Sequence, residues 1–308
     1  MKLHRFSVRM AFRRYGVRLM LVLLAAGVAL VSANLGAAQT DVPGEPVIIP
    51  GINIAGWGQV DEVLGRFSRP AGPTPKVPAV LILHGAFGVD GRGVFYAKAL
   101  NEAGIAALEI TMFPPNSPPR DGPKATMPHA AAALKWLAAQ PTVDSRRLGI
   151  MGFSWGGIMT VLMSSELVQE RLGQDVPRPV AFAPFYPCCS LLAGRILVNP
   201  QSPFCNAHTR MSGAPMLIQV GTRDDFEEGE RTCDALVSMW PAVARDHTIV
   251  HYIEGATHDF DSQGPGKNFY ARLSHAGHGG MVSVVPSPKD AAEARQAVVN
   301  FFVKHLNP

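Results

Sequence analysis

The N-terminal segment lacks acidic residues and, over a long stretch, any charge. The first 18 residues contain six Lys or Arg residues and no Asp or Glu, and no charged residue occurs between Leu19 and Thr40. A basic start, an apolar run and small residues at 36–38 are typical of a secretory signal peptide. We therefore expect residues 1–38 to be a signal peptide that is cleaved before Gln39. The alternative is an uncleaved membrane anchor, because the uncharged run is long enough to span a bilayer.

The chain without this leader lacks an excess of positive charge. The net charge of +4 reflects 28 Lys and Arg residues against 24 Asp and Glu residues. Removing the six cations of the leader leaves 22 against 24, a net charge near −2. No basic patch therefore argues for a nucleic-acid partner, and membrane contact is expected only if the leader stays attached. The expected location of the exported protein is the periplasm or the medium.

Cysteine is scarce, and no Cys-x-x-Cys pair predicts a metal site. An even number of cysteines in an exported protein favours disulfides. A bridge between the adjacent Cys188 and Cys189 would be strained, so two pairings remain open, with free buried thiols as the alternative. His275 and His278 stand three residues apart without partnered acids, and we expect no metal there. The disulfide candidates are Cys188, Cys189, Cys205 and Cys233.

No internal repeat is present, and short apolar runs alternate with helical patterns. The run at 79–83 is apolar throughout, as a parallel strand buried on both faces requires. The alternation continues to the C-terminus and predicts an α/β fold with a mostly parallel central sheet and helices on both faces. We expect residues 39–59 to form an N-terminal extension and residues 60–308 to form a single domain. Residues 261–287, rich in glycine and histidine, are expected to form a loop or a small insertion.

A serine lies between two glycines where an expected strand meets an expected helix. The motif Gly152-x-Ser154-x-Gly156 follows the apolar run at 147–151 and precedes another that begins at Ile158. This order is typical of a nucleophile elbow, a tight turn that presents the serine hydroxyl outside the sheet. A side chain at either flanking glycine should collide with neighbouring backbone. The alternative is a plain glycine turn.

An acid and a histidine follow Ser154 in the order that parallel-sheet hydrolases use. Asp224 comes after an expected strand at 216–220, and His258 after an expected strand at 248–252. Because the carboxyl ends of parallel strands share one sheet edge, the three groups should meet there. A serine hydroxyl needs such a neighbouring base to become a good nucleophile. The sequence therefore predicts a serine-centred catalytic triad.

At these positions the chain resembles the dienelactone hydrolase family of the α/β-hydrolase fold, over roughly residues 60–306. The resemblance rests on the elbow and on His84-Gly85-Ala86-Phe87-Gly88, Phe185-Tyr186-Pro187, Gly221-x-x-Asp224 and Gly255-Ala256-x-His258-x-Phe260. It implies that Ser154 is the nucleophile, that His258 is the base and that Asp224 orients the base. It also implies no cofactor and an oxyanion hole made by the backbone N–H groups of Ala86 and Trp155. The family pattern favours a disulfide between Cys189 and Cys233, which would leave Cys188 to pair with Cys205.

Three departures from the family pattern bear on the substrate. Members that open dienelactones use a cysteine nucleophile, where this chain has Ser154. They carry a glutamate after the first-strand histidine, where this chain has Gly85. They also place an arginine four residues after the catalytic histidine, where this chain has Ser262. These differences fit a general serine esterase of the family better than an enzyme for dienelactone.

Other residues near the motifs receive weaker assignments. His84 is expected to be structural, and Asp259 and Asp261 are expected to be solvated loop charges. Asp225 should point to solvent or cap the following helix. Arg120 and Arg223 are further candidates for contact with an acidic substrate. Candidates for the walls of a substrate pocket are Phe87, Trp155 and Arg120, with core packing as the alternative for Trp155.

Together these features predict an exported serine hydrolase that cleaves a carboxylic ester or lactone through an acyl-enzyme on Ser154. The expected partner is a small-molecule ester or lactone. Two other classes remain open. One is a peptidase or acyltransferase with the same triad. The other is a non-catalytic binding protein on the same fold, which would need no nucleophile.

Overall fold

The computed structural model describes residues 44–72, 75–229 and 231–307. The expected signal peptide at residues 1–38 lies outside these residues, as does the beginning of the expected extension. Within the described part of the chain, no helix is both long enough and apolar enough to cross a membrane.

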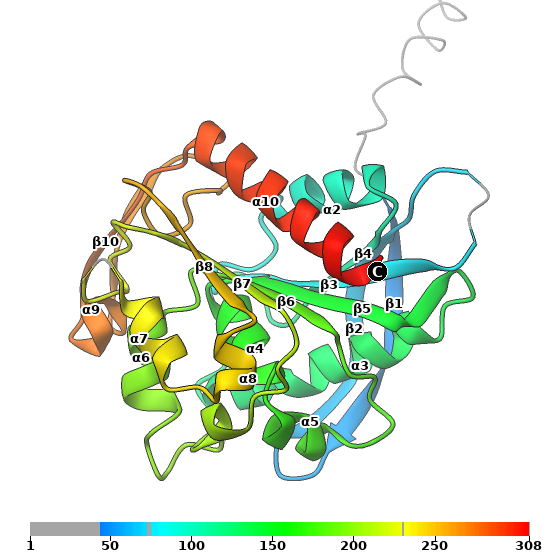
Figure 1. The fold of residues 1–308 in the computed structure, drawn as a ribbon, viewed down its shortest axis with the longest axis horizontal. Helices are drawn as coiled ribbons and strands as arrows, with labels where there is room; N and C mark the ends of the chain where they lie inside the picture. Colours follow the sequence, from blue (N-terminus) through cyan, green and yellow to red (C-terminus); the bar gives the residue numbers. More distant parts are fainter. Residues whose placement is uncertain (1–43, 73–74, 230, 308) are drawn as a thin grey trace, which may run out of the picture. The chain divides into compact units, whose positions relative to one another are not determined.

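An eight-stranded sheet with the order β1-β2-β4-β3-β5-β6-β7-β8 forms the centre of the fold (Figure 1). β1 and β2 are antiparallel, as are β2 and β4, whereas all neighbouring strands from β4 to β8 are parallel. The α/β class with a mostly parallel sheet is therefore confirmed. The strands are β1 (Glu45–Ile54), β2 (Gly58–Ser68), β3 (Val77–Leu83), β4 (Ala106–Thr111), β5 (Val143–Phe153), β6 (Ala181–Phe185), β7 (Met216–Gly221) and β8 (Thr248–Ile253).

The first strand changes the expected domain boundary. β1 begins at Glu45 and pairs with β2 from Glu45↔Phe67 to Ile54↔Gly58. Residues 45–59 are thus part of the central sheet and not an extension that precedes it. The segment contains Pro46 and Pro50, and most of its residues are at least partly exposed, so it resembles an exposed edge more than the apolar run of β3, in which every residue is buried.

Helices cover both faces of the sheet (Figure 1). α2 (Arg92–Glu102) and α10 (Pro288–Leu306) lie on one face, and α3 (Met127–Ala138) and α4 (Trp155–Met163) lie on the other. The segment between β7 and β8 forms two short helices and not one, because Pro241 cannot donate an internal helical hydrogen bond and begins the second. The shorter helices are α5 (Glu166–Leu172), α6 (Cys189–Leu191), α7 (Thr232–Ser238), α8 (Ala242–Arg245) and α9 (Ser274–Gly277), with helical turns η1 (Gly122–Thr126), η2 (Leu192–Ile196) and η3 (Ala207–Arg210).

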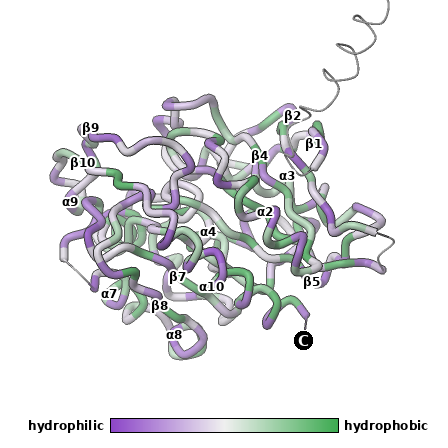
Figure 2. Tube along the Cα trace, turned by 90° about the horizontal axis from the view of Figure 1, so that it is seen from above, coloured by the Kyte–Doolittle hydropathy of each residue, from purple (hydrophilic) through white to green (hydrophobic). Residues whose placement is uncertain are grey.

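The closing helix shows how the sequence builds this layer. Ser287 caps α10 by accepting a hydrogen bond from the backbone N–H of Asp290, and Pro288 occupies the first turn. Apolar residues then recur at helical spacing and are buried at Ala291, Ala294, Val298 and Phe302. Figure 2 shows hydrophobic and hydrophilic residues alternating along this helix. Burying this stripe fixes α10 against the sheet.

A second, two-stranded sheet occupies the region expected to be a loop or insertion. β9 (Lys267–Ala271) and β10 (Gly280–Val284) pair antiparallel, with the α9 turn between them. Val282 and Val284 of β10 are buried, whereas the opposed Tyr270 and Met281 are exposed. The hairpin therefore has one face packed on the protein, and this face helps to wall the site described next.

Candidate active site

Ser154 stands at a strained turn between β5 and α4. Its backbone has φ 50° and ψ −106°, and its N–H donates to the carbonyl oxygen of Phe185 in β6 at 3.0 Å. A Cβ added at Gly152 would lie 2.3 Å from the carbonyl oxygen of Gly156, and one at Gly156 would lie 2.2 Å from that of Leu83. The expected collisions are therefore present, and the turn needs both glycines.

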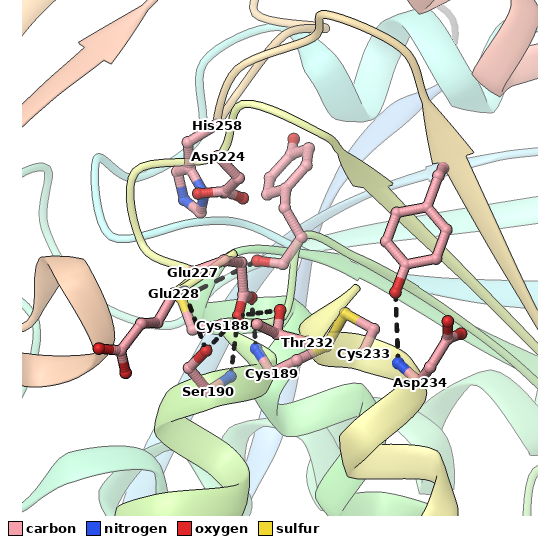
Figure 3. The surroundings of a disulfide bond; sticks show 12 residues. Cys188, Cys189, Ser190, Asp224, Glu227, Glu228, Thr232, Cys233, Asp234 and His258 are labelled. Carbon is pink, nitrogen blue, oxygen red and sulfur yellow. Dashed lines mark hydrogen bonds and ion pairs between the residues drawn. A yellow bond between two sulfur atoms is a disulfide. The ribbon is translucent and has the colours of Figure 1, made fainter. Parts of the chain in front are cut away.

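The structure brings His258 and Asp224 to this serine. Nε2 of His258 lies 2.9 Å from Oγ of Ser154, and Nδ1 lies 2.9 and 2.8 Å from the two carboxylate oxygens of Asp224. Figure 3 shows the imidazole beside that carboxylate. Both side chains are buried. They meet although the whole of β8 lies between them in the sequence. A hydroxyl, an imidazole and a carboxylate in this order can transfer a proton from the serine to the histidine.

The surroundings of His258 favour its protonated form. Burial alone would lower the pKa of the imidazole, but the charge and hydrogen bond of Asp224, together with the charge of Asp259, raise this pKa above its ordinary value. Asp224 also accepts the backbone N–H of Phe226 at 2.9 Å, and the ring of Phe226 packs at 4.3 Å from the imidazole centroid. The acid and the ring are thus fixed together.

Asp225 does not contact His258, but its position also differs from the one that we expected. Its side-chain oxygen accepts the backbone N–H of Ser283 in β10 at 2.8 Å, and its carbonyl accepts the N–H of His275 at 2.8 Å. The expected roles in solvent or as a helix cap are therefore wrong. Asp225 joins the loop after β7 to the β9–β10 hairpin, a partner that is distant in sequence.

The residues expected to form the oxyanion hole lie in the loop after β3 and at the start of α4. Ala86 and Trp155 both line the cavity that contains Ser154. Trp155 begins α4, where first-turn N–H groups have no intrahelical acceptor. His84 is buried and bridges this loop, because its Nδ1 contacts the carbonyl oxygen of Gly85 at 2.7 Å and its Nε2 accepts the N–H of Met112 at 2.9 Å. Burial lowers the pKa of His84, which fits a neutral, structural ring.

A mainly apolar cavity of about 360 Å³ opens beside Ser154. Phe87 and Trp155 line it as expected, and Nε1 of Trp155 donates to Oγ1 of Thr126 at 3.1 Å. Arg120 does not line it and is exposed, so that assignment is wrong; the loop at 112–126 contributes Asn116 and Pro118 in its place. The other walls are Ala86, Ile158, Cys188, Leu191, Phe226, Phe269, Ala271, Arg272 and Leu273.

One disulfide joins Cys189 to Cys233, as the family pattern favours. Cys188 and Cys205 are free thiols, so the expected second bridge is wrong. The reason is that the neighbours diverge. Cys188 adopts a left-handed backbone with φ 51° and lines the cavity, whereas Cys189 begins α6 and reaches α7.

Glu227 is a buried acid that the sequence did not single out. Its carboxylate accepts the N–H groups of Cys189 at 2.5 Å and Ser190 at 2.9 Å, and the hydroxyls of Ser190 at 2.8 Å and Thr232 at 2.7 Å (Figure 3). Its own N–H donates to the carbonyl oxygen of Asp224 at 3.0 Å. Glu227 and the disulfide together fasten the loop of the candidate acid to α6.

The expectation that Asp259 and Asp261 are solvated is wrong. Their exposed fractions are 2% and 0%, and both face Arg92, which is 1% exposed. Arg92 was not among the expected site residues. The sequence does contain a signal for the burial of these acids, because they stand on both sides of the aromatic Phe260, directly after His258. A cation far away in the sequence is needed to make this burial favourable.

The described residues contain one compact group of side chains with ligand atoms of the kind that binds metals. These are Cys189, Glu227 and Cys233, whose ligand atoms lie within 4.8 Å of one another. Both sulfurs are committed to the disulfide and cannot act as thiolates. Nε2 of His275 instead contacts the carbonyl oxygen of Met281 at 3.2 Å.

Residues 63–306 match the profile of the Dienelactone hydrolase family. The chain belongs to the dienelactone hydrolase family. As a family member it is a hydrolase with the α/β-hydrolase fold.

Solved structures similar to this dienelactone hydrolase family member include esterases and a putative dienelactone hydrolase. Thermogutta terrifontis esterase 2 superposes with a TM-score of 0.60 and 16% identity over 86% of this chain and 95% of that chain. Est1E from Butyrivibrio proteoclasticus gives 0.55 and 16% over 86% and 100%. The putative dienelactone hydrolase from Klebsiella pneumoniae subsp. pneumoniae gives 0.54 and 17% over 84% and 99%. At these identities the superpositions support the fold alone.

A curated relative is named as a peptidase and not as an esterase. It is a probable dipeptidyl-aminopeptidase B from Ajellomyces capsulatus, 26% identical over 83% of this chain. The match covers 30% of that relative's length. The chain thus spans less than a third of the length of this curated relative.

Proposed function

We propose that this protein is an exported serine esterase that hydrolyses a carboxylic ester or lactone through an acyl-enzyme on Ser154. The observation that carries this proposal is the pair of contacts made by His258. One nitrogen lies 2.9 Å from the serine oxygen and the other lies 2.8 Å from Asp224. The adjoining apolar cavity gives a small ester a place to bind.

The proposed reaction has two steps. In the first, Ser154 attacks the carbonyl carbon while Nε2 of His258 takes the hydroxyl proton, and the resulting imidazolium is stabilised by Asp224. Backbone N–H groups at Ala86 and Trp155 would stabilise the oxyanion. The imidazolium then protonates the leaving alcohol. In the second step, water attacks the acyl-enzyme with the same histidine as the base, and the acid is released.

The cavity favours an uncharged or apolar substrate group over a cationic one. Aromatic and aliphatic side chains form most of its wall, including Phe87, Phe226 and Phe269. None of the described residues that line it is acidic, and the charged residue among them is Arg272. A peptide with a protonated amino terminus would find no counter-charge there. Ester hydrolysis therefore fits better than the aminopeptidase activity in the name of the curated relative.

Export is the second part of the proposal. It is supported by the basic and apolar N-terminal sequence and by the Cys189–Cys233 disulfide, because disulfides persist mainly in oxidising compartments. Edman sequencing or peptide mapping of the protein recovered outside the cytoplasm should give Gln39 as its first residue. Recovery of the chain with its leader intact would support the anchor.

The test of the reaction is the Ser154→Ala variant. We expect kcat for short p-nitrophenyl esters to fall by about 10⁴-fold to 10⁶-fold, because a triad member is lost. The circular dichroism spectrum and melting temperature should stay close to those of the unaltered protein. A panel of dipeptidyl p-nitroanilides, assayed beside the esters, distinguishes a peptidase from an esterase, because only a peptidase should cleave the anilides. A variant that keeps more than about a tenth of the rate would exclude Ser154 as the nucleophile.

A further inference from the structure

Arg92 is a fully buried cation at the start of α2, next to the candidate active site. Its guanidinium forms a fork on the partly exposed Asp90, with Nε at 2.9 Å and Nη2 at 2.6 Å from the two carboxylate oxygens. Such two-point pairing fixes the orientation of the planar group. The remaining nitrogen, Nη1, is therefore held in one direction, toward the interior.

The inward nitrogen contacts the residue that follows His258. Nη1 donates to the carboxylate of Asp259 at 2.5 Å. Asp259 has a left-handed backbone with φ 53°, a conformation that costs energy in a residue other than glycine. Burial would raise the pKa of this carboxyl, but Arg92 and His258 lower it below its ordinary value. The ion pair thus holds Asp259 charged and in place.

The same nitrogen also contacts the aromatic residue that packs on His258. Nη1 donates to the phenol oxygen of Tyr186 at 2.6 Å, and Tyr186 donates in turn to Asp261 at 2.5 Å. The hydroxyl of Tyr96 donates to the second oxygen of Asp261 at 2.7 Å. The Tyr186 ring lies 4.8 Å from the imidazole of His258, centroid to centroid, in a T-shaped arrangement. The network therefore reaches two sides of the histidine.

The guanidinium also packs on the strand that presents the serine. Its central carbon lies 4.9 Å from the ring centroid of Phe153, the residue directly before Ser154. Cation–π contacts of this kind are stronger when the cation is desolvated. One side chain thus touches the immediate neighbours of the candidate nucleophile and of the candidate base.

We propose that Arg92 is a positioning residue, which holds the His258 loop against the strand that presents Ser154. This inference rests on the proposed esterase function. Four of its five N–H donors are used, by Asp90, Asp259 and Tyr186. A lysine ammonium is a point charge and cannot make the same fork while reaching inward. The residue needed is therefore an arginine, and not any cation.

The first test compares Arg92→Lys with Arg147→Lys. The partly exposed Arg147 forms hydrogen bonds with Asp144, Asn307 and the carbonyl oxygen of Lys76, none of which belongs to the network of Arg92, and it serves as the matched control. We expect Arg92→Lys to lower kcat for a p-nitrophenyl ester by about 10²-fold with little change in KM, as misplaced catalytic groups do. Arg147→Lys should leave kcat unchanged. An Arg92→Lys protein with native circular dichroism and an unchanged kcat would overturn the proposal.

A second readout is the dependence of kcat/KM on pH. If Arg92 only stabilised the fold, its replacement would not shift this profile in a defined direction. Arg92 lowers the pKa of His258 through its charge and Asp259 raises it. Arg92→Gln should therefore shift the acid limb of kcat/KM to higher pH, and Asp259→Asn should shift it to lower pH. Shifts of the acid limb in the same direction for both variants, or no shift in either variant, would contradict the proposal. The charged or titratable groups that face the imidazole or its partners are Asp224, Asp259, Asp261, Arg92, Asp90, Lys267, Tyr186, Tyr96, Cys188 and Glu227.

Removing a buried cation can prevent folding, so Tyr186→Phe provides an independent test. This change keeps the ring against His258 and removes the hydroxyl that links Arg92 to Asp261. We expect kcat to fall by about 10-fold with KM preserved, a smaller effect because Asp259 still pairs with Arg92. A folded Tyr186→Phe protein with unaltered kcat and pH profile would overturn the proposal.

If the unaltered protein neither hydrolyses esters nor reacts with a fluorophosphonate, the proposed function itself fails. This result differs from a failure of the Arg92 proposal, in which the unaltered protein is active and the variants do not change its rate.

Discussion

The carboxylate of Glu227 accepts the backbone N–H of Cys189 at 2.5 Å, and the disulfide of that cysteine reaches Cys233 in the helix that follows Glu227. The loop that carries Asp224 is thus fastened at two points to α6. The residue before Cys189 is Cys188, which lines the cavity beside Ser154. A covalent link next to the wall of the cavity therefore bears on the position of the acid.

Removing this link should cost stability. The bridge spans a sequence separation of 44, and in the chain-entropy model a loop of this length contributes about 4 kcal/mol. We expect the Cys189→Ser, Cys233→Ser double variant to lose about this much free energy of unfolding in urea. Cys205→Ser is the control and should be close to neutral, since its thiol is free. Equal midpoints for the double variant and the unaltered protein would mean that the bridge does not stabilise the fold.

Thiol titration checks the pairing separately. The denatured, unreduced protein should show two reactive thiols, Cys188 and Cys205. Peptide mapping without reduction should recover Cys189 and Cys233 in one linked species. Four reactive thiols in protein isolated from an oxidising compartment would contradict the pairing.

The adjacent acids Asp224 and Asp225 should have unequal roles. Asp224→Asn should lower kcat by about 10⁴-fold, because an amide would favour the wrong tautomer of His258. Asp225→Asn weakens a hydrogen bond to Ser283 and should cost about 1 kcal/mol of stability with little change in rate. Steady-state kinetics of both variants at one pH, with urea unfolding of each, decides between them. The reverse ranking of the two rates would assign the triad acid to Asp225.

Activity should fall on the acid side at a pH set by His258. The base acts in its neutral form, and the surroundings of His258 raise its pKa. The kcat/KM profile should therefore increase with pH and have its midpoint above 6.5, the ordinary value for histidine. A profile measured in buffers of constant ionic strength tests this. A midpoint below 6.5 would mean that burial outweighs the charge of Asp224.

Much of the sheet and the candidate triad could be predicted from the sequence, because both depend on local patterns. The apolar run of β3 requires burial on both faces, and Gly152 and Gly156 are needed by the turn itself. Asp224 and His258 follow strands whose carboxyl ends share an edge. These inferences need only strand order and turn chemistry.

What the sequence could not predict depends on partners that are distant along the chain. Asp259 resembles an ordinary loop acid until Arg92, 167 positions earlier, is placed against it. The divergence of Cys188 and Cys189 depends on a left-handed backbone at Cys188, which no local composition requires. The proline-containing segment of β1 also has no clear strand pattern, and its pairing with β2 makes it an edge strand. In each case the tertiary contact decides the environment.

Covalent labelling tests the central claim most directly. The unaltered protein and Ser154→Ala are treated with a fluorophosphonate probe, and the adduct is located by intact mass and peptide sequencing. An activated serine displaces fluoride from phosphorus and becomes covalently modified. We predict one adduct per chain, on Ser154, that is absent from the alanine variant. Recovery of the protein without an adduct, or with the adduct on another residue, would contradict the account.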